Sequence, residues 1–392
     1  MTDARAEVVV VGLGAAGAAI LLQLARRGVR AIGIDRFAPP HAHGSTHGDT
    51  RITRLAIGEG DAYTPLVKRS HAVWRELEAE TGMELLTQNG GLVLESPSAH
   101  HPMHNRFDFL DRTIACARTH GIEHEVIDAA QVSQRFPQFA LDGDERAYYE
   151  PGAGFVRPER CVAAQLEVAQ RLGAQVHVNE TVTGIADHEV RTAGATYRAG
   201  TVVLAAGPWL ATLVSPALSG LFTVYPQVLT WYALRADAID HGPSAMPVYI
   251  WGAAKDGHFY GFPAVDGVAS GLKAATESFE HPTTADTIRG DVAAAETDAL
   301  FTALVGPRLP GLTSRCVKAV RCLYTVTPDG DFVIDWDPER EHVLLVSPCS
   351  GHGFKHSAGV GDAVARWLTS GTRPEELHPF GLDRLVSRSV SP

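Results

Sequence analysis

The sequence predicts an α/β fold, in which a second domain is inserted into a discontinuous nucleotide-binding domain. Three observations predict it. A strand, a glycine-rich turn and a helix open the chain at 8–27, a similar unit comes near its end at 341–371, and aromatic-rich strands lie between them at 228–263. Apolar strands that alternate with helices favour a parallel sheet. We expect the inserted domain to be built on a mixed or antiparallel sheet plus helices.

The first unit has the features of a dinucleotide-binding turn. Its valine run at 8–11 is typical of a buried parallel strand. In the following GLGAAG motif, Gly12 allows a tight turn, Gly14 lets the backbone approach a pyrophosphate, and Gly17 lets the helix pack close to the strand. The diphosphate would then lie at the positive end of the helix. The pattern predicts a Rossmann-like nucleotide site, and a turn of the same shape without a ligand is the alternative.

A second strand ends in an acid that suits a ribose. Asp35 stands 23 positions after Gly12, where its carboxylate can accept hydrogen bonds from a ribose diol. Arg36 beside it is expected to contact the cofactor too. Because an acid at this place disfavours a 2′-phosphate, NADP is the least expected dinucleotide.

The apolar stretch 8–24 has two other interpretations, a signal peptide or a membrane span. The preceding residues, MTDARAE, are net acidic, whereas a signal peptide begins with basic residues. Three glycines inside the stretch would weaken a membrane helix. We therefore expect no membrane association, and the spacing of the glycines favours the nucleotide turn.

Composition excludes some classes of partner. The chain has 392 residues, which suits two domains or one large one, and its formal charge of −11 argues against a nucleic-acid partner. The five cysteines are scattered and odd in number. They give no disulfide framework, so a reducing, cytoplasmic setting is expected.

The remaining elements define the domain limits. A helix is expected at 62–82, mixed short strands and helices at 88–150, a helix, glycine stop and strand at 158–185, and a strand at 197–204 that leads back to the nucleotide site. We assign 1–87, 153–223 and 323–392 to the nucleotide-binding domain. The substrate domain is assigned 88–152 and 224–322.

The segment 41–60 is dense in glycine, histidine and arginine, so it is expected to be a binding loop. His41, His43 and His47 raise the possibility of a metal. No cysteine or carboxylate pattern supports zinc, and no metal site is predicted.

Three stretches carry a resemblance that goes beyond this general pattern. They are GSTHGDTRITRLAIGEG (44–60), CLYTVTPDGDFVID (322–335) and SGHGFKHSAGVG (350–361). With the N-terminal motif, they resemble the monomeric sarcosine oxidase and N-methyltryptophan oxidase family, which are amine-oxidising flavoenzymes of the D-amino-acid-oxidase type. The resemblance covers nearly the whole chain in the same order. It implies FAD as cofactor and a monomer, and Asp49 and Glu59 are expected to order the loop or to meet the ribityl side of the flavin.

The resemblance also implies how the flavin is held. In the family FAD is linked through a cysteine, and Cys322 matches it, so a thioether to the 8-methyl carbon of the flavin ring is expected. The alternative for Cys322 is a buried small apolar residue. His47 and Arg51 would lie against the flavin and could favour the thiolate. The other matching cofactor contacts are Ser45, Thr50, Val182, Gly207, Gly351, Gly353, Phe354 and Lys355.

The same resemblance assigns the chemistry. Arg54 and Lys355 match the cations that hold the substrate carboxylate, a task for which a planar guanidinium is well suited. Lys273 matches the lysine over the flavin that promotes the reaction with O₂. Tyr260 and Tyr324 match residues of the pocket. The expected reaction is the oxidation of a secondary or cyclic amino acid to an imine, with reduction of O₂ to H₂O₂.

Two departures leave the substrate open. Glu277 stands where the family commonly has a histidine, and Pro348-Cys349 replaces a Gly-Phe pair. A flavin dehydrogenase that passes electrons to a carrier, a flavoprotein that has lost catalysis and an NAD-dependent dehydrogenase remain alternatives.

Overall fold

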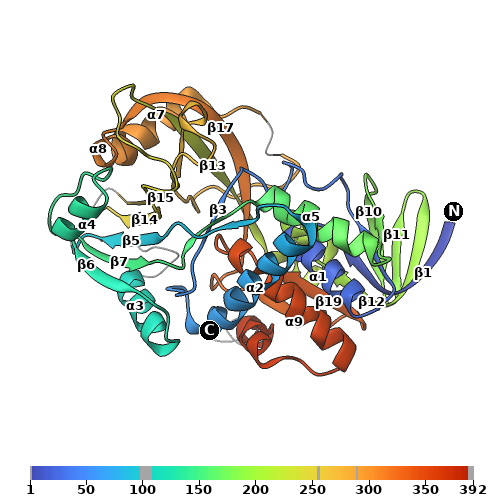
Figure 1. The fold of residues 1–392 in the computed structure, drawn as a ribbon. Helices are drawn as coiled ribbons and strands as arrows, with labels where there is room; N and C mark the ends of the chain where they lie inside the picture. The colour runs from blue at the N-terminus through green and yellow to red at the C-terminus, as the bar shows by residue number, and fades with distance from the viewer. Residues whose placement is uncertain (1, 98–107, 254–256, 288–289, 387–392) are drawn as a thin grey trace, which may run out of the picture.

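The computed structural model describes residues 2–97, 108–253, 257–287 and 290–386. They form two lobes, each built on an eight-stranded sheet. The long strands β13 (Thr223–Leu234) and β17 (Leu312–Val326) run from one lobe toward the other (Figure 1). Together the lobes give the α/β fold that the sequence predicts.

The first sheet takes its strands from the beginning, middle and end of the chain. Its order is β10-β11-β12-β1-β2-β9, and β19 pairs with both β12 and β18. The central pairs β9–β2, β2–β1, β1–β12 and β12–β19 are parallel. The bounds are β1 (Thr2–Val11), β2 (Ala31–Ile34), β9 (Gln175–His177), β10 (Val182–Ala186), β11 (Glu189–Thr192), β12 (Ala195–Leu204), β18 (Val333–Trp336) and β19 (Val343–Ser347).

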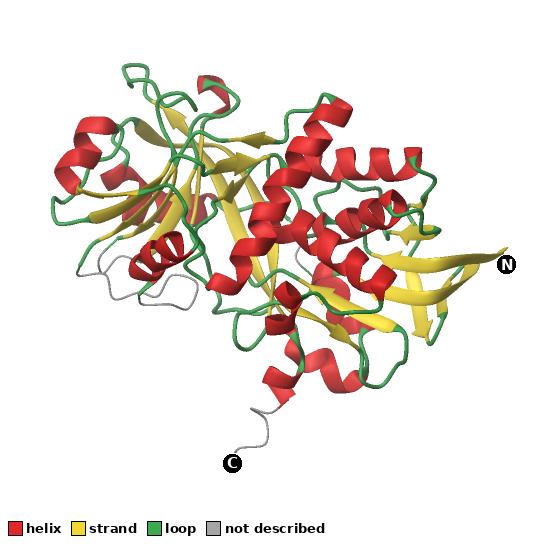
Figure 2. Cartoon of the chain, turned by 60° about the horizontal axis from the view of Figure 1, so that its bottom comes forward, coloured by secondary structure: helices red, strands yellow, loops and turns green. Residues whose placement is uncertain are grey.

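Both faces of this sheet are buried. Val8 and Val10 pack toward the helices α1 (Ala15–Arg26), α2 (Thr64–Thr81), α5 (Pro158–Arg171) and α9 (Ser357–Ser370), which lie beside the sheet (Figure 2). Val9 and Val11 alternate to the other face, where Leu210 covers them. A strand that is buried on both faces needs a continuous apolar run, which explains the valines.

The apolar stretch 8–24 therefore belongs to the core. It divides into the end of β1 and most of α1, and α1 packs between α5 and α9. Among the described residues, no helix combines the length and the hydropathy that a membrane crossing requires.

The second sheet is mixed, as expected for the inserted domain. Its order is β17-β13-β16-β15-β14-β5-β7-β6, and only the β14–β5 pair is parallel. Apolar side chains of one face pack against α4 (Ala129–Arg135) and the segment 300–309. The other bounds are β5 (Gly91–Glu95), β6 (Glu125–Asp128), β7 (Arg146–Glu150), β14 (Val248–Gly252), β15 (His258–Gly261) and β16 (Leu272–Ala275).

Short elements complete the described chain. A third sheet joins β3 (Arg51–Thr53), β8 (Gly154–Val156) and β4 (Leu86–Thr87). The remaining helices are α3 (Phe109–Thr119), α6 (Leu210–Leu213), α7 (Ala294–Leu300), α8 (Gly306–Arg308) and α10 (Asp383–Val386), with short turns η1 (Asp61–Tyr63), η2 (Gly207–Trp209), η3 (Pro216–Leu221), η5 (Val268–Ser270), η6 (Phe301–Val305), η7 (Phe354–His356) and η8 (Glu375–Phe380).

The expected elements lie close to their predicted places. The helix expected at 62–82 is α2, and the helix and the strand expected at 158–185 are α5 and β9. The proposed domain limits at 223/224 and 322/323 fall within β13 and β17. Because these two strands pair along their whole length, they continue across the proposed limits.

Candidate active site

A cavity of about 460 Å³ lies at the carboxyl ends of β1, β2, β12 and β19. Its wall includes Gly12, Asp35, Ala205 and Ser347 from these strand ends, and Tyr260 from the second sheet. Parallel α/β sheets bind their ligands at the carboxyl ends of the strands. The cavity therefore lies where the glycine motif predicts a dinucleotide and extends from there to the inserted domain.

The glycine motif is packed as the sequence predicts. Gly12 has φ +89°, and a Cβ on it would lie 2.6 Å from the oxygen of Ala205. A Cβ on Gly17 would lie 1.8 Å from the oxygen of Gly12, so only glycine lets α1 approach the turn. Gly14 precedes α1, and its nearest neighbour would be Thr46 Oγ1 at 3.4 Å. The backbone at Gly14 is thus open to a ligand.

Asp35 fixes the glycine turn from the end of β2. Its Oδ2 accepts the backbone N–H of Leu13 at 2.7 Å, and its Oδ1 accepts that of Phe37 at 2.8 Å. His41 Nε2 lies 3.4 Å from the same carboxylate. Arg36, next in the chain, lines the cavity and pairs with Asp286 at 2.8 Å. Contact of Asp35 with a ribose stays a prediction.

Cys322 lies in a cationic environment behind the cavity wall. Arg51 Nη2 is 3.4 Å from its Sγ, and His47 lies near enough to lower the pKa of the thiol as well. Burial alone would raise the pKa of this thiol, but Arg51 and His47 outweigh burial and lower the pKa to about 7. Cys322 does not line the cavity, whereas its neighbours Ser45, Arg51 and Tyr324 do. A substantial fraction of this thiol is therefore thiolate near neutral pH.

Lys273 on β16 is fully buried and points at the binding loop. Its Nζ donates to the oxygens of Gly48 at 2.7 Å and Thr50 at 2.8 Å, and it lies 5.3 Å from the ring centre of Trp231. Burial, followed by the charge of Arg51, holds the pKa of Lys273 well below its usual value. Neither Lys273 nor Thr50 lines the cavity. Lys273 thus fixes the loop that separates it from the cavity.

Arg54 and Lys355 meet at one carboxylate. Arg54 Nη2 lies 2.6 Å from Glu59 Oε2, and Lys355 Nζ lies 3.1 Å from Glu59 Oε1. The side chains of Arg54 and Glu59 are only 4% exposed, and all three residues line the cavity. Burial lowers the pKa of Lys355 to about 8, although Glu59 opposes this shift. The structure therefore brings together Arg54 and Lys355, the two residues predicted to bind the substrate carboxylate. Glu59 is their counter-ion, which the sequence analysis did not anticipate.

A polar group faces these cations from the second lobe. Tyr260 and Tyr324 are hydrogen-bonded to each other, and burial raises the pKa of Tyr260 to about 12 and that of Tyr324 well above its usual value. Both phenols are therefore neutral. Glu277 lies beside them, with His258 Nε2 3.3 Å from its carboxylate. His258 stands two positions before Tyr260 on β15, so strand alternation could have identified it.

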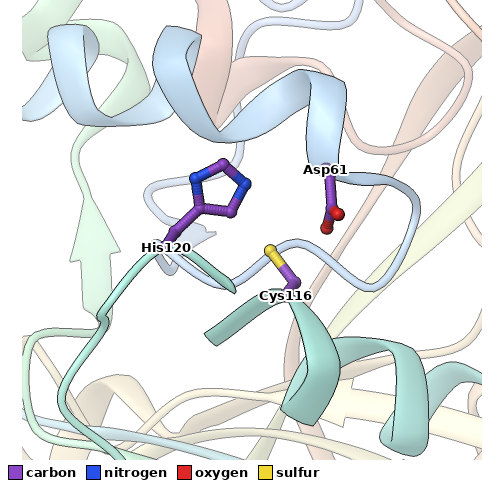
Figure 3. A group of neighbouring side chains, drawn as sticks. All are labelled: Asp61, Cys116 and His120. Carbon is purple, nitrogen blue, oxygen red and sulfur yellow. The ribbon is translucent and has the colours of Figure 1, made fainter. Parts of the chain in front are cut away.

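A second cluster fastens the loop that carries Glu59. Figure 3 shows the side chains of Asp61, Cys116 and His120 converging, and their ligand atoms lie within 4.8 Å of one another. The Cys116 sulfur accepts the backbone N–H of Ile57 at 3.2 Å. These three residues do not line the cavity, so they hold the loop against α3 from outside. The expectation of no metal site stays a prediction.

The structure places most of the predicted site residues on the wall of a single cavity. Those that line the cavity are Gly12, Gly14, Asp35, Arg36, Ser45, Arg51, Arg54, Val182, Gly207, Tyr260, Tyr324, Gly351, Gly353, Phe354 and Lys355. Five others stand behind that wall: Gly17, His47, Thr50, Lys273 and Cys322. Gly17 serves packing, as predicted, and the other four are joined to one another and to Arg51 through contacts at the binding loop.

The chain is similar to characterised proteins over almost its whole length. Residues 7–367 match the FAD dependent oxidoreductase family. Monomeric sarcosine oxidase of Streptomyces avermitilis is 36% identical over 381 residues, which cover 96% of each chain. N-methyl-L-tryptophan oxidase of Yersinia pestis is 31% identical over 383 residues, which cover 96% of this chain and 99% of the relative.

Solved structures share the fold. NikD, an unusual amino acid oxidase essential for nikkomycin biosynthesis, superimposes with a TM-score of 0.79 at 24% identity, covering 96% of this chain and 97% of its own. L-proline dehydrogenase from P. horikoshii gives a TM-score of 0.82 at 20% identity, covering 99% of each chain. The superpositions cover almost the whole chain, so the chain shares its fold with these structures in both lobes.

Proposed function

The chain belongs to the FAD-dependent oxidoreductase family, and from this membership we propose that it oxidises a secondary or cyclic amino acid to an imine and reduces O₂ to H₂O₂. An N-methyl amino acid is the simplest substrate of this class. The named activities of the sarcosine and N-methyltryptophan oxidases support the proposal. The five free thiols support a reducing, cytoplasmic location as part of it.

The convergence of Arg54 and Lys355 carries this proposal. Two buried cations on the wall of one cavity share one carboxylate, Glu59, in direct contact, while the charge of Glu277 also acts on Lys355. A buried charge is costly unless an opposite charge pairs with it. A substrate carboxylate supplies that charge, and the planar guanidinium of Arg54 can donate two parallel hydrogen bonds to it. The substrate is therefore held by its acid end.

The residues present fit FAD. The motif at Gly12 and Gly14 leaves an open backbone at the start of α1 for the pyrophosphate, and Asp35 lies at the end of β2 on the ribose side. When bound, FAD supplies the electron acceptor for the substrate C–H bond and the route of electrons to oxygen.

We propose that the flavin is attached through Cys322. The sulfur must be a thiolate to form a thioether, and Arg51 and His47 favour that form at neutral pH. The C–S bond would replace the S–H bond and one C–H bond of the flavin 8-methyl group, and the two protons and two electrons released would pass to O₂, the acceptor of the proposed reaction, as H₂O₂. Ser45, Arg51 and Tyr324 line the cavity next to the thiol, whereas Cys322 does not. Attachment therefore requires a small movement of these side chains. A buried thiol with cationic neighbours is better explained by attachment of the flavin than by packing alone.

The protein residues prepare the substrate amine. Hydride loss requires a neutral amine, and the cations Arg54 and Lys355 lower the pKa of an ammonium that binds beside them. Tyr260 and Tyr324 are neutral at physiological pH and can orient the amine without adding charge. Lys273 is assigned to promoting the reaction with O₂ from behind the loop 48–50.

Reduction of the bound flavin under argon tests the proposal. The purified holoenzyme is mixed with N-methyl and cyclic amino acids, and the loss of the visible flavin bands is followed with the mass of the product. We expect bleaching with at least one of these compounds, an imine or its hydrolysis products, and peroxide on admission of air. Bleaching without peroxide would instead support transfer to a carrier. A protein without visible flavin, or without bleaching by any of them, would refute the proposed function.

A further inference from the structure

Near Arg54 and Lys355, the cavity contains a carboxylate besides Glu59 that the binding of an ordinary amino acid does not use. Glu277 lies just after β16 (Leu272–Ala275), and its side chain is only 2% exposed. It lines the cavity with His258, whose Nε2 is 3.3 Å away. A Cβ on Gly351 would lie 3.3 Å from Glu277 Oε1, so the carboxylate reaches the glycine turn before α9. The group therefore faces the site from the second lobe.

The charged residues at the proposed substrate site fall into two groups with different direct partners. Arg54 and Lys355, with Glu59 between them, carry one net positive charge and suit the substrate carboxylate. Glu277 lies beside Tyr260 with His258 as its direct partner, and its charge also acts on Lys355. A buried carboxylate binds a cation or an N–H donor strongly because the surrounding dielectric is low. The cavity thus has one pole for an anion and another for a donor.

The amine that is oxidised is a poor partner for Glu277. A carboxylate next to an ammonium favours the charged form and raises its pKa. Hydride loss needs the neutral amine, so such a contact would oppose the reaction. A second nitrogen, away from the oxidised carbon, can stay protonated throughout. The position of Glu277 is therefore better matched to a side-chain group of the substrate.

We propose that Glu277, held by His258, recognises a second basic nitrogen on the substrate, so the preferred substrate class is N-alkyl or cyclic amino acids that carry an additional amine. This inference rests on the proposed function. It makes Glu277 a specificity-determining residue, and the proposed carboxylate-binding role of Arg54 and Lys355 is unchanged. Tyr260 and Tyr324 remain neutral neighbours of the pair.

Matched substrate pairs test this inference without any mutation. Anaerobic flavin reduction is measured with the Nα-methyl derivatives of lysine, ornithine and 2,4-diaminobutyrate, each against the compound in which a methyl group replaces the terminal amine. For each compound, the rate constant of flavin reduction is divided by the dissociation constant. At the chain length that fits, we expect this ratio to be about tenfold or more higher for the amine, which corresponds to one charge-assisted hydrogen bond. Equal values at all three lengths would overturn the inference, although the proposed function would stand.

A variant pair assigns the effect to Glu277. Glu277→Gln should bring the ratio of each amine to its methyl-terminated partner to within about threefold of one, whatever its effect on either rate, since a residual preference of that size is under 1 kcal/mol. Glu280→Gln, which removes the same charge from a side chain that is 84% exposed, should keep the preference. Equal slowing of both members of a pair by Glu277→Gln would place Glu277 at the oxidised amine and refute the assignment. If no compound bleaches the flavin, the proposed function fails and the inference falls with it.

Discussion

The guanidinium Nη2 of Arg51 lies 3.4 Å from the Sγ of Cys322, although 271 positions separate the two residues. The contact joins the binding loop to β17, and the Oγ1 and backbone oxygen of Thr50, next to Arg51, accept from Lys273. The thiol, the arginine and the lysine therefore form one connected group, in which Arg51 lines the cavity and the other two residues lie behind it. Its electrostatics decide whether the sulfur can act as a nucleophile.

Cys322→Ser should abolish the covalent attachment of the flavin, although FAD can still bind noncovalently. The change removes the sulfur but keeps the size of the side chain. Flavin fluorescence of the denatured protein band after acid precipitation measures the link. Cys349→Ser is the matched control, because Cys349 lines the cavity itself and burial raises the pKa of its thiol. Covalent flavin in the serine variant at 322 would contradict the assignment.

Attachment should follow the ionisation of Cys322. Its pKa is lowered to about 7, so the thiolate is present above that value and is lost as the pH falls through it. When apoprotein is mixed with FAD, the attachment rate should fall about tenfold from pH 8 to pH 6. Arg51→Gln removes the largest factor that lowers this pKa, so attachment should be slow at pH 7 and recover at pH 9.

Lys318→Gln serves as the control for that experiment. Lys318 pairs with Asp49 in the same loop region but is 43% exposed. Its rates should match the wild type at each pH. If Arg51→Gln attaches flavin at the wild-type rate throughout, the arginine does not set the state of the thiol.

Carboxylate binding should weaken at alkaline pH. Lys355 has a pKa of about 8, because burial outweighs the opposing effect of Glu59, and it loses its charge as the pH rises through that value. The dissociation constant of propionate, followed by perturbation of the flavin spectrum, should rise by about tenfold between pH 7 and pH 9.

Glu59→Gln should change this profile in two ways. Without the counter-ion, both cations are available and propionate should bind more tightly at pH 6.5. The pKa of Lys355 should also fall further, because Glu59 raises it, so the loss of binding begins at a lower pH. A dissociation constant that does not vary with pH in either protein would exclude Lys355 from the anion site.

Lys273→Met should slow the reaction of reduced flavin with O₂ far more than flavin reduction, by on the order of a hundredfold or more. Burial and Arg51 lower the pKa of Lys273. The wild-type reoxidation rate should therefore decline with rising pH at a lower pH than that at which a lysine of ordinary pKa loses its proton. Lys318→Met is the control, because both ammonium groups lie over the ring of Trp231 and Lys318 is partly exposed. If Lys273→Met slows flavin reduction and reoxidation by O₂ equally, Lys273 only holds the loop in place and does not promote the reaction with O₂.

The nucleotide turn could be predicted from local sequence alone. The roles of Gly12 and Gly17 follow from their spacing between a strand and a helix, and the packing of the two glycines agrees with that prediction. The limits of α2 and α5 also follow from apolar periodicity and from the stops that follow them. These features depend on residues that are close in the sequence.

The charge relationships could not be predicted in this way. Glu59 is five positions from Arg54 but 296 from Lys355, and only the folded chain shows that it joins them. The pairing of Glu277 with His258 likewise requires the register of β15 and β16. Resemblance supplied the role expected of Cys322, whereas the reason for its lowered pKa became visible only when Arg51 and His47 were placed beside it.

One measurement tests the central claim, that buried cations hold an amino acid by its carboxylate while its amine is oxidised. The anaerobic rate of flavin reduction is compared for an N-methyl amino acid and its neutral carboxamide, in wild type and in Arg54→Ala. We expect the acid to react about a hundredfold faster or more in wild type, given two charge-assisted hydrogen bonds, and the difference to shrink sharply in the variant. Equal rates for acid and amide in the wild-type enzyme would contradict the account.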